Sequence, residues 1–373
     1  MAATALPPPA IVQPGPYEAS FGLVSGTVAP GTRRLVIRVG GSVLADRPLR
    51  GRTFSVRVAL PRRDVRLRVT AYDARGRAAS AEVGPVFGLP RSAAPRSVAG
   101  REDAVLGRAV RTLVSSFPGT AGVYVQSLTT GAGAAWNARA QFPAASTLKL
   151  GIAVAVLRAH EGKPAEGSRV DALLRSMLWY SDNAAANALE VWLAGSTSGG
   201  SARVNALFAE LGLDDTIMYG GYEIRTPQGP IPVRIESQPA FGLGKHTTAS
   251  DLARLARAVW LAAGGKGPLA EHARGAFTPA DGRYLLYLLA HVHDPGKLDR
   301  FLGGGQAGVW VLHKAGWLAT ARHDAGLVFW PGGVYVAAVL TYGRGVGAPS
   351  DVLAGRVAEA ALKRFAAVNP RTG

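Results

Sequence analysis

Strict alternation of apolar and polar residues over residues 21–87 constrains the fold of this chain more than any other feature. The alternation is clearest in three stretches, at residues 34–39, 55–60 and 65–69, where arginine occupies many of the polar positions. Because side chains alternate between the two faces of a strand, period two predicts strands with one buried face and one face in water. Turn-forming residues at 40–41 and 73–76 separate the stretches. The sequence therefore predicts a small all-β sandwich over residues 17–88.

The segments on either side of this domain are rich in proline, serine and alanine. Residues 1–16 are predicted to be a flexible leader, and residues 89–102 a linker. The first residues lack a basic stretch followed by a continuous apolar run, so no signal peptide is visible. No apolar run approaches the roughly 20 residues that span a bilayer.

A different periodicity begins near residue 103. It predicts helices at 104–113, 148–160, 170–180, 250–262, 283–291 and 350–367, and strands at 121–127, 309–313, 325–330 and 334–341. The order is a helix and a strand, a long helical middle, and then strands and a helix. It predicts an antiparallel sheet whose strands come from both ends of residues 103–370, with an all-helical insertion between them. A chain of 373 residues is long enough for these two domains.

Cysteine content and charge limit the chemistry. The chain has no cysteine, which excludes disulfides, thiolate metal ligands and a cysteine nucleophile. Its 42 Lys and Arg against 25 Asp and Glu give a net charge of +17, which favours anionic partners such as cell-wall polymers. A solvated basic surface without a dedicated partner stays open, because the arginines are spread along the chain. We expect no nucleic-acid partner and a monomer.

The first motif is Ser146-x-x-Lys149, in the segment FPAASTLKL at residues 142–150. Residues three apart share a face of a helix, so the lysine amine can lie against the serine hydroxyl. A serine hydroxyl is a poor nucleophile until a base takes its proton, and a lysine serves as that base only when its pKa is lowered. A serine that merely caps a helix would give the same spacing.

The second motif is Ser181-Asp182-Asn183, at the end of one predicted helix and the start of another. A hydroxyl and an amide on one turn can relay a proton and bind a substrate amide, although Asp182 also suits a helix cap. The third motif is Lys314-Ala315-Gly316, at the end of an apolar strand. The glycine would allow a substrate backbone to approach an edge strand, although a strand-end turn with a surface lysine is the alternative.

Other polar clusters carry weaker signals. His291, His293 and Asp294 lie close together in sequence, but at a predicted helix end where histidine is common. We therefore expect no metal site and no cofactor. Gly303-Gly304-Gly305 is a lone glycine run that indicates a loop, and no G-x-S-x-G motif is present.

The three motifs, in this order, resemble the signature of class A β-lactamases and penicillin-binding proteins. The flanking segments HTTASDLARL (246–255) and DAGLVFWPGGVYVAAVLTYG (324–343) resemble the same family. The resemblance covers residues 100–368 and implies an α+β, β-lactamase/transpeptidase-like fold, with an antiparallel sheet flanked by helices plus an all-helical subdomain. The segment GRTFSVRVALP (51–61) resembles bacterial immunoglobulin-like domains, which implies a spacer or adhesion module.

The family resemblance also implies roles at the matching positions. Ser146 would be acylated, and Lys149 would act as a general base or proton shuttle. Ser181 would pass a proton to the leaving nitrogen, Asn183 would hold the substrate amide, and Lys314 would attract the substrate carboxylate. The backbone N–H groups of Ser146 and Trp317 would form the oxyanion hole.

Two departures from the family pattern concern recognition and turnover. Ala315 stands where the family has Thr or Ser, so a hydroxyl for the substrate carboxylate is missing, and His313 or Ser181 would have to compensate. The glutamate that activates the deacylating water is not recognisable by its usual neighbours. Glu223 and Glu236 are the two candidates, and a surface position is open for each.

These features predict a serine hydrolase of the class A β-lactamase type, acylated at Ser146 by a β-lactam or a related amide. The nearest alternative is a D-alanyl-D-alanine carboxypeptidase or endopeptidase acting on peptidoglycan peptides. An alternative of another class is a cell-wall or antibiotic binding protein with negligible turnover. We expect the protein in the cell envelope or outside the cell.

Overall fold

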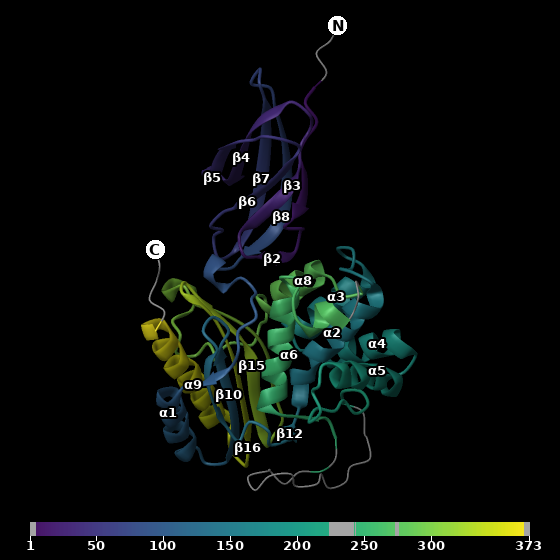
Figure 1. Ribbon diagram of the computed structural model, residues 1–373. Helices are drawn as coiled ribbons and strands as arrows, with labels where there is room; N and C mark the ends of the chain where they lie inside the picture. Colours follow the sequence, from purple (N-terminus) through teal and green to yellow (C-terminus); the bar gives the residue numbers. More distant parts are fainter. Residues whose placement is uncertain (1–4, 224–241, 243, 273–275, 369–373) are drawn as a thin grey trace. The chain divides into compact units, whose positions relative to one another are not determined.

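The computed structural model describes residues 5–223, 242, 244–272 and 276–368. The chain divides into two compact units, Met1–Ala94 and Pro95–Gly373 (Figure 1). The division falls inside the segment that the sequence predicts to be the linker. Among the described residues, no helix is long and apolar enough to cross a membrane.

The first unit consists of two β-sheets with a shared apolar core. One sheet has the strand order β1-β3-β6 and the other β2-β8-β7-β4-β5. The strands are β1 Ala10–Gln13, β2 Glu18–Ser20, β3 Leu23–Thr27, β4 Thr32–Val39, β5 Ser42–Pro48, β6 Thr53–Arg57, β7 Asp64–Asp73 and β8 Ala78–Gly88. Leu35 and Ile37 from one sheet and Phe54 from the other meet in this core, as the period-two pattern predicts.

The predicted leader is shorter than expected. Strand β1 pairs with β3 in antiparallel register, and Ile11 packs against the core of the unit. The flexible-leader prediction is therefore wrong for Ala10–Gln13. The reason is that a four-residue strand flanked by prolines carries too little periodicity to recognise in the sequence.

The second unit is built on a six-stranded sheet with the order β14-β15-β16-β10-β11-β9. Its strands are β9 Arg101–Glu102, β10 Thr120–Ser127, β11 Ala132–Trp136, β14 Trp310–Trp317, β15 Ala321–Trp330 and β16 Gly333–Tyr342. Strand β10 pairs with β16, which confirms that the two ends of the domain meet in one sheet. All neighbours are antiparallel except β9 and β11, and β9 extends the sheet into the predicted linker.

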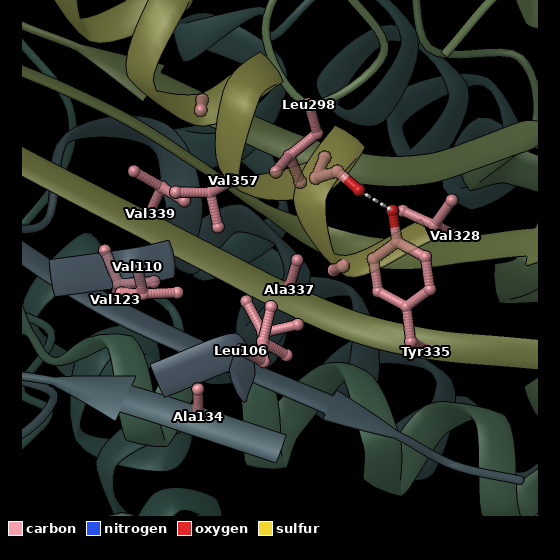
Figure 2. Close-up of a cluster of buried hydrophobic side chains, with 14 of the residues drawn as sticks. Leu106, Val110, Val123, Ala134, Leu298, Val328, Tyr335, Ala337, Val339 and Val357 are labelled. Carbon is pink, nitrogen blue, oxygen red and sulfur yellow. Dashed lines mark hydrogen bonds between the residues drawn. The ribbon is translucent and has the colours of Figure 1, made fainter. Parts of the chain in front are cut away.

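Helices cover both faces of this sheet. Helices α1 Ala104–Ser115 and α9 Gly347–Val368 lie together on one face, and α6 Ala249–Ala262 packs against β10, β15 and β16 (Figure 1). Figure 2 shows the core under α1 and α9, where Val110, Val123, Val339 and Val357 meet. There the Tyr335 hydroxyl donates a hydrogen bond of 2.7 Å to the carbonyl of Ala358.

The predicted helical insertion is present between β11 and β14. It contains α2 Lys149–His160, α3 Arg169–Trp179, α4 Asn183–Ala194, α5 Thr197–Glu210, α7 Pro268–His272 and α8 Pro279–Leu289, in addition to α6. A short antiparallel pair, β12 Phe142–Pro143 with β13 His246–Thr247, lies just before the turn that carries the first motif. Helix α2 is buried along most of its length, which places its first residues in the interior.

Candidate active site

Ser146 lies in a tight turn that leads into α2. The turn is a 3-10 helix, Ala145–Leu148, and Ala145 has a φ of 49°. A non-glycine residue in this left-handed region is strained and persists only where the surrounding structure enforces it. The turn therefore fixes the half-buried Ser146 at the start of α2, as the spacing of the first motif predicts.

Lys149 is fully buried and has three hydrogen-bond acceptors around its amine. Its Nζ donates to the carbonyl of Ser181, to Ser181 Oγ at 3.3 Å and to Asn183 Oδ1 at 2.5 Å. An ammonium has three protons, so these acceptors use all of them. Among the described residues, no hydrogen bond joins Lys149 to Ser146. Loss of one proton would free the lone pair that a general base needs.

The surroundings of Lys149 favour that loss. Burial and the nearby charge of Lys314 lower the pKa of Lys149 to about 7, although Asp182 and Glu223 act in the opposite direction. A lysine with a pKa near neutrality is partly unprotonated at physiological pH and can accept a proton from a serine.

Ser181 lies between two lysines. Its Oγ accepts a hydrogen bond of 2.9 Å from Lys314 Nζ and the longer one from Lys149. Ser181 has a φ of 58°, and Asp182 caps α4 by accepting hydrogen bonds from the backbone N–H groups of Ala184 and Ala185. The cap function considered for Asp182 is therefore confirmed.

Lys314 is buried at the open edge of the sheet. Burial lowers its pKa to about 8, although the carboxylates of Asp294 and Asp324 counteract part of this effect. Its Nζ also donates a hydrogen bond of 2.7 Å to the carbonyl of Ala315. At neutral pH the group keeps its charge and supplies a positive potential beside Ser181.

Gly316 allows β14 to approach the nucleophile turn. A Cβ at this position would lie 2.7 Å from the backbone nitrogen of Ser146 and 2.9 Å from that of Thr147. The glycine thus accommodates the backbone of the nucleophile turn, and the predicted approach of a substrate backbone to this strand stays a prediction. Leu318 N–H donates to β15, and N–H groups alternate along a strand. The N–H of Trp317 therefore points to the free edge, beside Ser146.

His313 cannot compensate for the missing hydroxyl at Ala315. Alternation along β14 places its side chain on the opposite face from Lys314, where its Nδ1 lies 2.6 Å from Asp324 Oδ1. Burial disfavours the imidazolium, but Asp324 outweighs this effect and raises the pKa of His313. Ala315 itself is buried, and the residues that line the cavity described below do not include it.

Of the two candidate glutamates, the structure brings Glu223 into the site. Glu223 accepts a hydrogen bond of 2.7 Å from Asn183 Nδ2, and the other atom of the same amide binds Lys149. Glu236 lies outside the described residues. The carboxylate of Glu223, the amide of Asn183 and the amine of Lys149 thus form one connected chain.

Tyr222 is a site residue that the sequence motifs do not predict. Its ring lies between two amines, 4.6 Å from Lys149 Nζ and 4.6 Å from Lys245 Nζ. Asn187 holds its backbone by accepting from the N–H at 2.6 Å and donating to the carbonyl at 2.9 Å. The sequence contained one indirect signal of this contact. Asn187 follows Asn183 by four residues, so both amides lie on the same face of α4, and Asn187 is the residue that binds Tyr222.

A cavity of about 910 Å³ opens onto these groups. The predicted site residues that line it are Ser146, Ser181, Asn183, Glu223, Lys314 and Trp317. Trp317 is 63% exposed at its mouth, and Tyr180 is 64% exposed and stacks on His293 with 4.9 Å between ring centroids. In the described part of the chain, no group of three metal-type side chains gathers.

The sequence profile of the beta-lactamase enzyme family matches residues 105–168 and 162–365. The structure of PBP-A is 24% identical, with a TM-score of 0.56, over 72% of this chain and 99% of that chain. A beta-lactamase from Sphaerobacter thermophilus DSM 20745 is 21% identical, with a TM-score of 0.53, over 72% and 99%.

A class A beta-lactamase from Mycobacterium abscessus is 19% identical, with a TM-score of 0.53, over 70% of this chain and 99% of that chain. These likenesses establish the predicted α+β fold of the second unit. No curated protein matches the chain.

Proposed function

Because the chain belongs to the beta-lactamase enzyme family and is a serine hydrolase of that type, we propose that Ser146 is acylated by a β-lactam or a related amide. The observation that carries the proposal is the buried Lys149, whose pKa of about 7 suits proton transfer beside Ser146. A second buried lysine nearby, Lys314, destabilises the charged form of Lys149, an arrangement that costs stability and that proton transfer would explain.

Acylation then proceeds as follows. Unprotonated Lys149 takes the proton of the Ser146 hydroxyl while the serine oxygen bonds to the substrate carbonyl carbon. The negative charge that develops on the carbonyl oxygen is stabilised by the N–H groups of Ser146 and Trp317. As the carbon–nitrogen bond breaks, Ser181 passes its proton to the leaving nitrogen and is reprotonated by Lys149. Lys314 attracts the substrate carboxylate.

Deacylation depends on Glu223, the candidate carboxylate in contact with Asn183. A water molecule activated by Glu223 would attack the ester at Ser146 and release the product. Replacing Glu223 with Gln should slow deacylation by at least about a hundredfold, the lower end of the effect of a general base. Burst kinetics would separate this step from acylation. An unchanged deacylation rate would show that Glu223 is not the base for the water, and Glu236→Gln would then be tested.

A peptidoglycan peptide is the second candidate substrate. Ala315 stands in β14 where the family pattern has a hydroxyl for the substrate carboxylate, which favours a substrate other than a classical penicillin. A D-alanyl-D-alanine carboxypeptidase or endopeptidase would use the same acylation step. Among the similar structures, a PBP-A variant is an acyl-enzyme complex with penicillin-G. Covalent capture of a penicillin is thus compatible with either substrate.

Two assays separate the candidates. A fluorescent penicillin should label the wild-type protein and not the Ser146→Ala variant. Hydrolysis of a chromogenic cephalosporin would identify a β-lactamase, whereas labelling with release of D-alanine from a wall pentapeptide would identify a peptidase. Absence of label at high penicillin concentration would refute acylation and leave a binding protein with negligible turnover.

The first unit supports a proposal of its own. We infer that it is an immunoglobulin-like module that retains the enzyme at an anionic cell-wall polymer, in the cell envelope or outside the cell. Arg38 and Arg68 lie directly opposite each other on neighbouring strands, and although Arg68 forms an ion pair with Glu82, the net charge of +17 favours an anionic partner. Co-sedimentation with purified walls should fall when both become Glu. Arg101, in the second unit, provides a control substitution.

A further inference from the structure

Five consecutive backbone carbonyls next to the active site are each held by a side chain. They belong to residues 218–222, and with Glu223 these residues are called here the clamped segment. The donors are Asn205 to Met218 at 3.0 Å, Lys245 to Tyr219 at 3.0 Å and to Gly221 at 2.5 Å, Ser201 to Gly220 at 3.1 Å, and Asn187 to Tyr222 at 2.9 Å. So complete a set of clamps fixes the backbone of a loop that has no regular secondary structure.

The clamped segment delivers two side chains to the site. Tyr222 covers Lys149, and Glu223 binds Asn183, which in turn binds Lys149. Both Gly220 and Glu223 have positive φ, 59° and 61°. A conformation of this kind at a non-glycine residue persists only when neighbouring contacts enforce it. The clamps are therefore part of the machinery that positions the reacting groups.

The hydrogen bonds of Ser201 indicate the protonation state of Glu190. Ser201 Oγ lies 2.8 Å from Glu190 Oε1 and 3.1 Å from the carbonyl of Gly220. A hydroxyl has a single proton, and neither a carboxylate nor a carbonyl can donate. Both contacts are hydrogen bonds only when Glu190 carries a proton, donates it to Ser201, and Ser201 donates to Gly220.

The surroundings of Glu190 agree with a neutral acid. Its side chain is 0% exposed, and its second oxygen, Oε2, has no hydrogen-bond partner among the described residues. Leaving an ionised oxygen buried without a donor is costly, whereas the carbonyl oxygen of a neutral acid tolerates it better. Gly200 allows this burial, because a Cβ there would lie 2.5 Å from the backbone of Glu190 and would force α4 and α5 apart.

We propose that Glu190 is held as a neutral carboxylic acid and, through Ser201, positions the clamped segment for catalysis. Ionisation would turn the Ser201 proton toward Glu190 and leave the Gly220 carbonyl without its donor. It would also attract Lys245, whose bonds hold Tyr219 and Gly221. The positioning role rests on the proposed function, whereas the protonation state of Glu190 does not.

The charged and titratable groups around Glu190 give the direction of the pH effect. Burial raises the pKa of Glu190 to about 7, opposed by the Ser201 hydrogen bond and by the charge of Lys245. Tyr222 faces it as well, and its own pKa is raised by burial. The neutral form, and with it the clamp on Gly220, is therefore present below about pH 7 and lost above it.

Infrared spectroscopy tests the protonation state without any enzymatic assay. The wild-type protein should keep a protonated carboxylic acid band at pH 6 that disappears as the pH rises through about 7. The Glu190→Gln variant should lack this band, whereas Glu210→Gln, a control at an exposed ion pair on α5, should retain it. Absence of such a band in the wild-type protein at pH 6 overturns the proposal, whether or not the variants fold.

The pH profile of penicillin labelling tests the positioning role. We expect the wild-type acylation rate to fall above pH 7 by about three- to tenfold, the factor for one hydrogen bond. Glu190→Gln, whose amide can still donate to Ser201, should lose this decline, and Ser201→Ala should be slow already at pH 6. A decline that is unchanged in Glu190→Gln overturns the role and assigns the effect to Lys314, whose pKa is about 8. Absence of label at every pH refutes the proposed function instead, and the infrared result stands.

Discussion

Replacing Gly316 with alanine should disable the oxyanion hole while leaving the protein folded. The added Cβ would lie 2.7 Å from the nitrogen of Ser146, whereas ordinary contacts begin at 3.4 Å. Both partners are backbone, so no flexible side chain can yield. Either β14 or the nucleophile turn must move by more than about half an ångström.

The shift acts on the hydrogen bonds that stabilise the transition state. A displacement of this size lengthens an N–H to oxygen bond from about 2.9 Å to beyond the range in which it contributes. Loss of one oxyanion-hole donor costs about 2.7–4 kcal/mol, or roughly a hundred- to a thousandfold in rate. Ground-state binding should change far less, because the donors are aimed at charge that develops only during the reaction.

Stopped-flow labelling with a fluorescent penicillin would measure the maximal acylation rate and the half-saturating concentration separately. The Gly316→Ala variant should lose the former by the stated factor and keep the latter within about threefold. Gly107→Ala is the matched control, since a Cβ in that helix meets nothing within 4 Å. An acylation rate within tenfold of wild type would refute the reasoning and show that β14 does not supply an oxyanion donor.

Three further outcomes are expected. In the Glu190→Gln variant, the acylation rate should rise with pH and level off above about pH 7, where Lys149 is unprotonated, and a rise that continues beyond pH 8 would contradict the assignment of Lys149 as the base. Deleting residues 1–94 should leave a folded, penicillin-labelled unit with cooperative thermal unfolding, and a molten product would mean that the two units share a core. Asn187→Ala should release the backbone of Tyr222 and lower the acylation rate while the protein stays folded, as labelling rates and melting temperatures would show.

The sequence predicted those features that depend on local pattern. Alternation located β4, β6 and β7 of the first unit, and the spacing of the first motif predicted a helix start, where Ser146 lies in the turn before α2 and Lys149 begins the helix. The motif order identified the groups around the cavity without any long-range information. Elements such as β1 and β9 were missed, because strands of two to four residues carry no measurable period.

What the sequence could not predict depends on contacts between distant segments. Tyr222 and Glu190 have ordinary sequence neighbours, and only the packing of α4 against α5 and the clamped segment gives them a role. The close packing of Gly316 on the nucleophile turn was not predicted, since the backbone of Ser146 is 170 positions away in the chain. Assigning Glu223 likewise required the position of the Asn183 amide.

The pairing of β10 with β16 has a consequence for synthesis on the ribosome. Strand β10 begins at Thr120, but its neighbour ends only at Tyr342, so the central sheet cannot close until most of the chain has emerged. The first unit, by contrast, draws its strands from residues 10–88 and can fold early. During the interval, helix α1 lacks α9, and helix α6 lacks β15 and β16, the elements on which they pack. Nascent chains stalled between residues 160 and 300 should therefore recruit chaperones, whereas chains stalled near residue 130 should not.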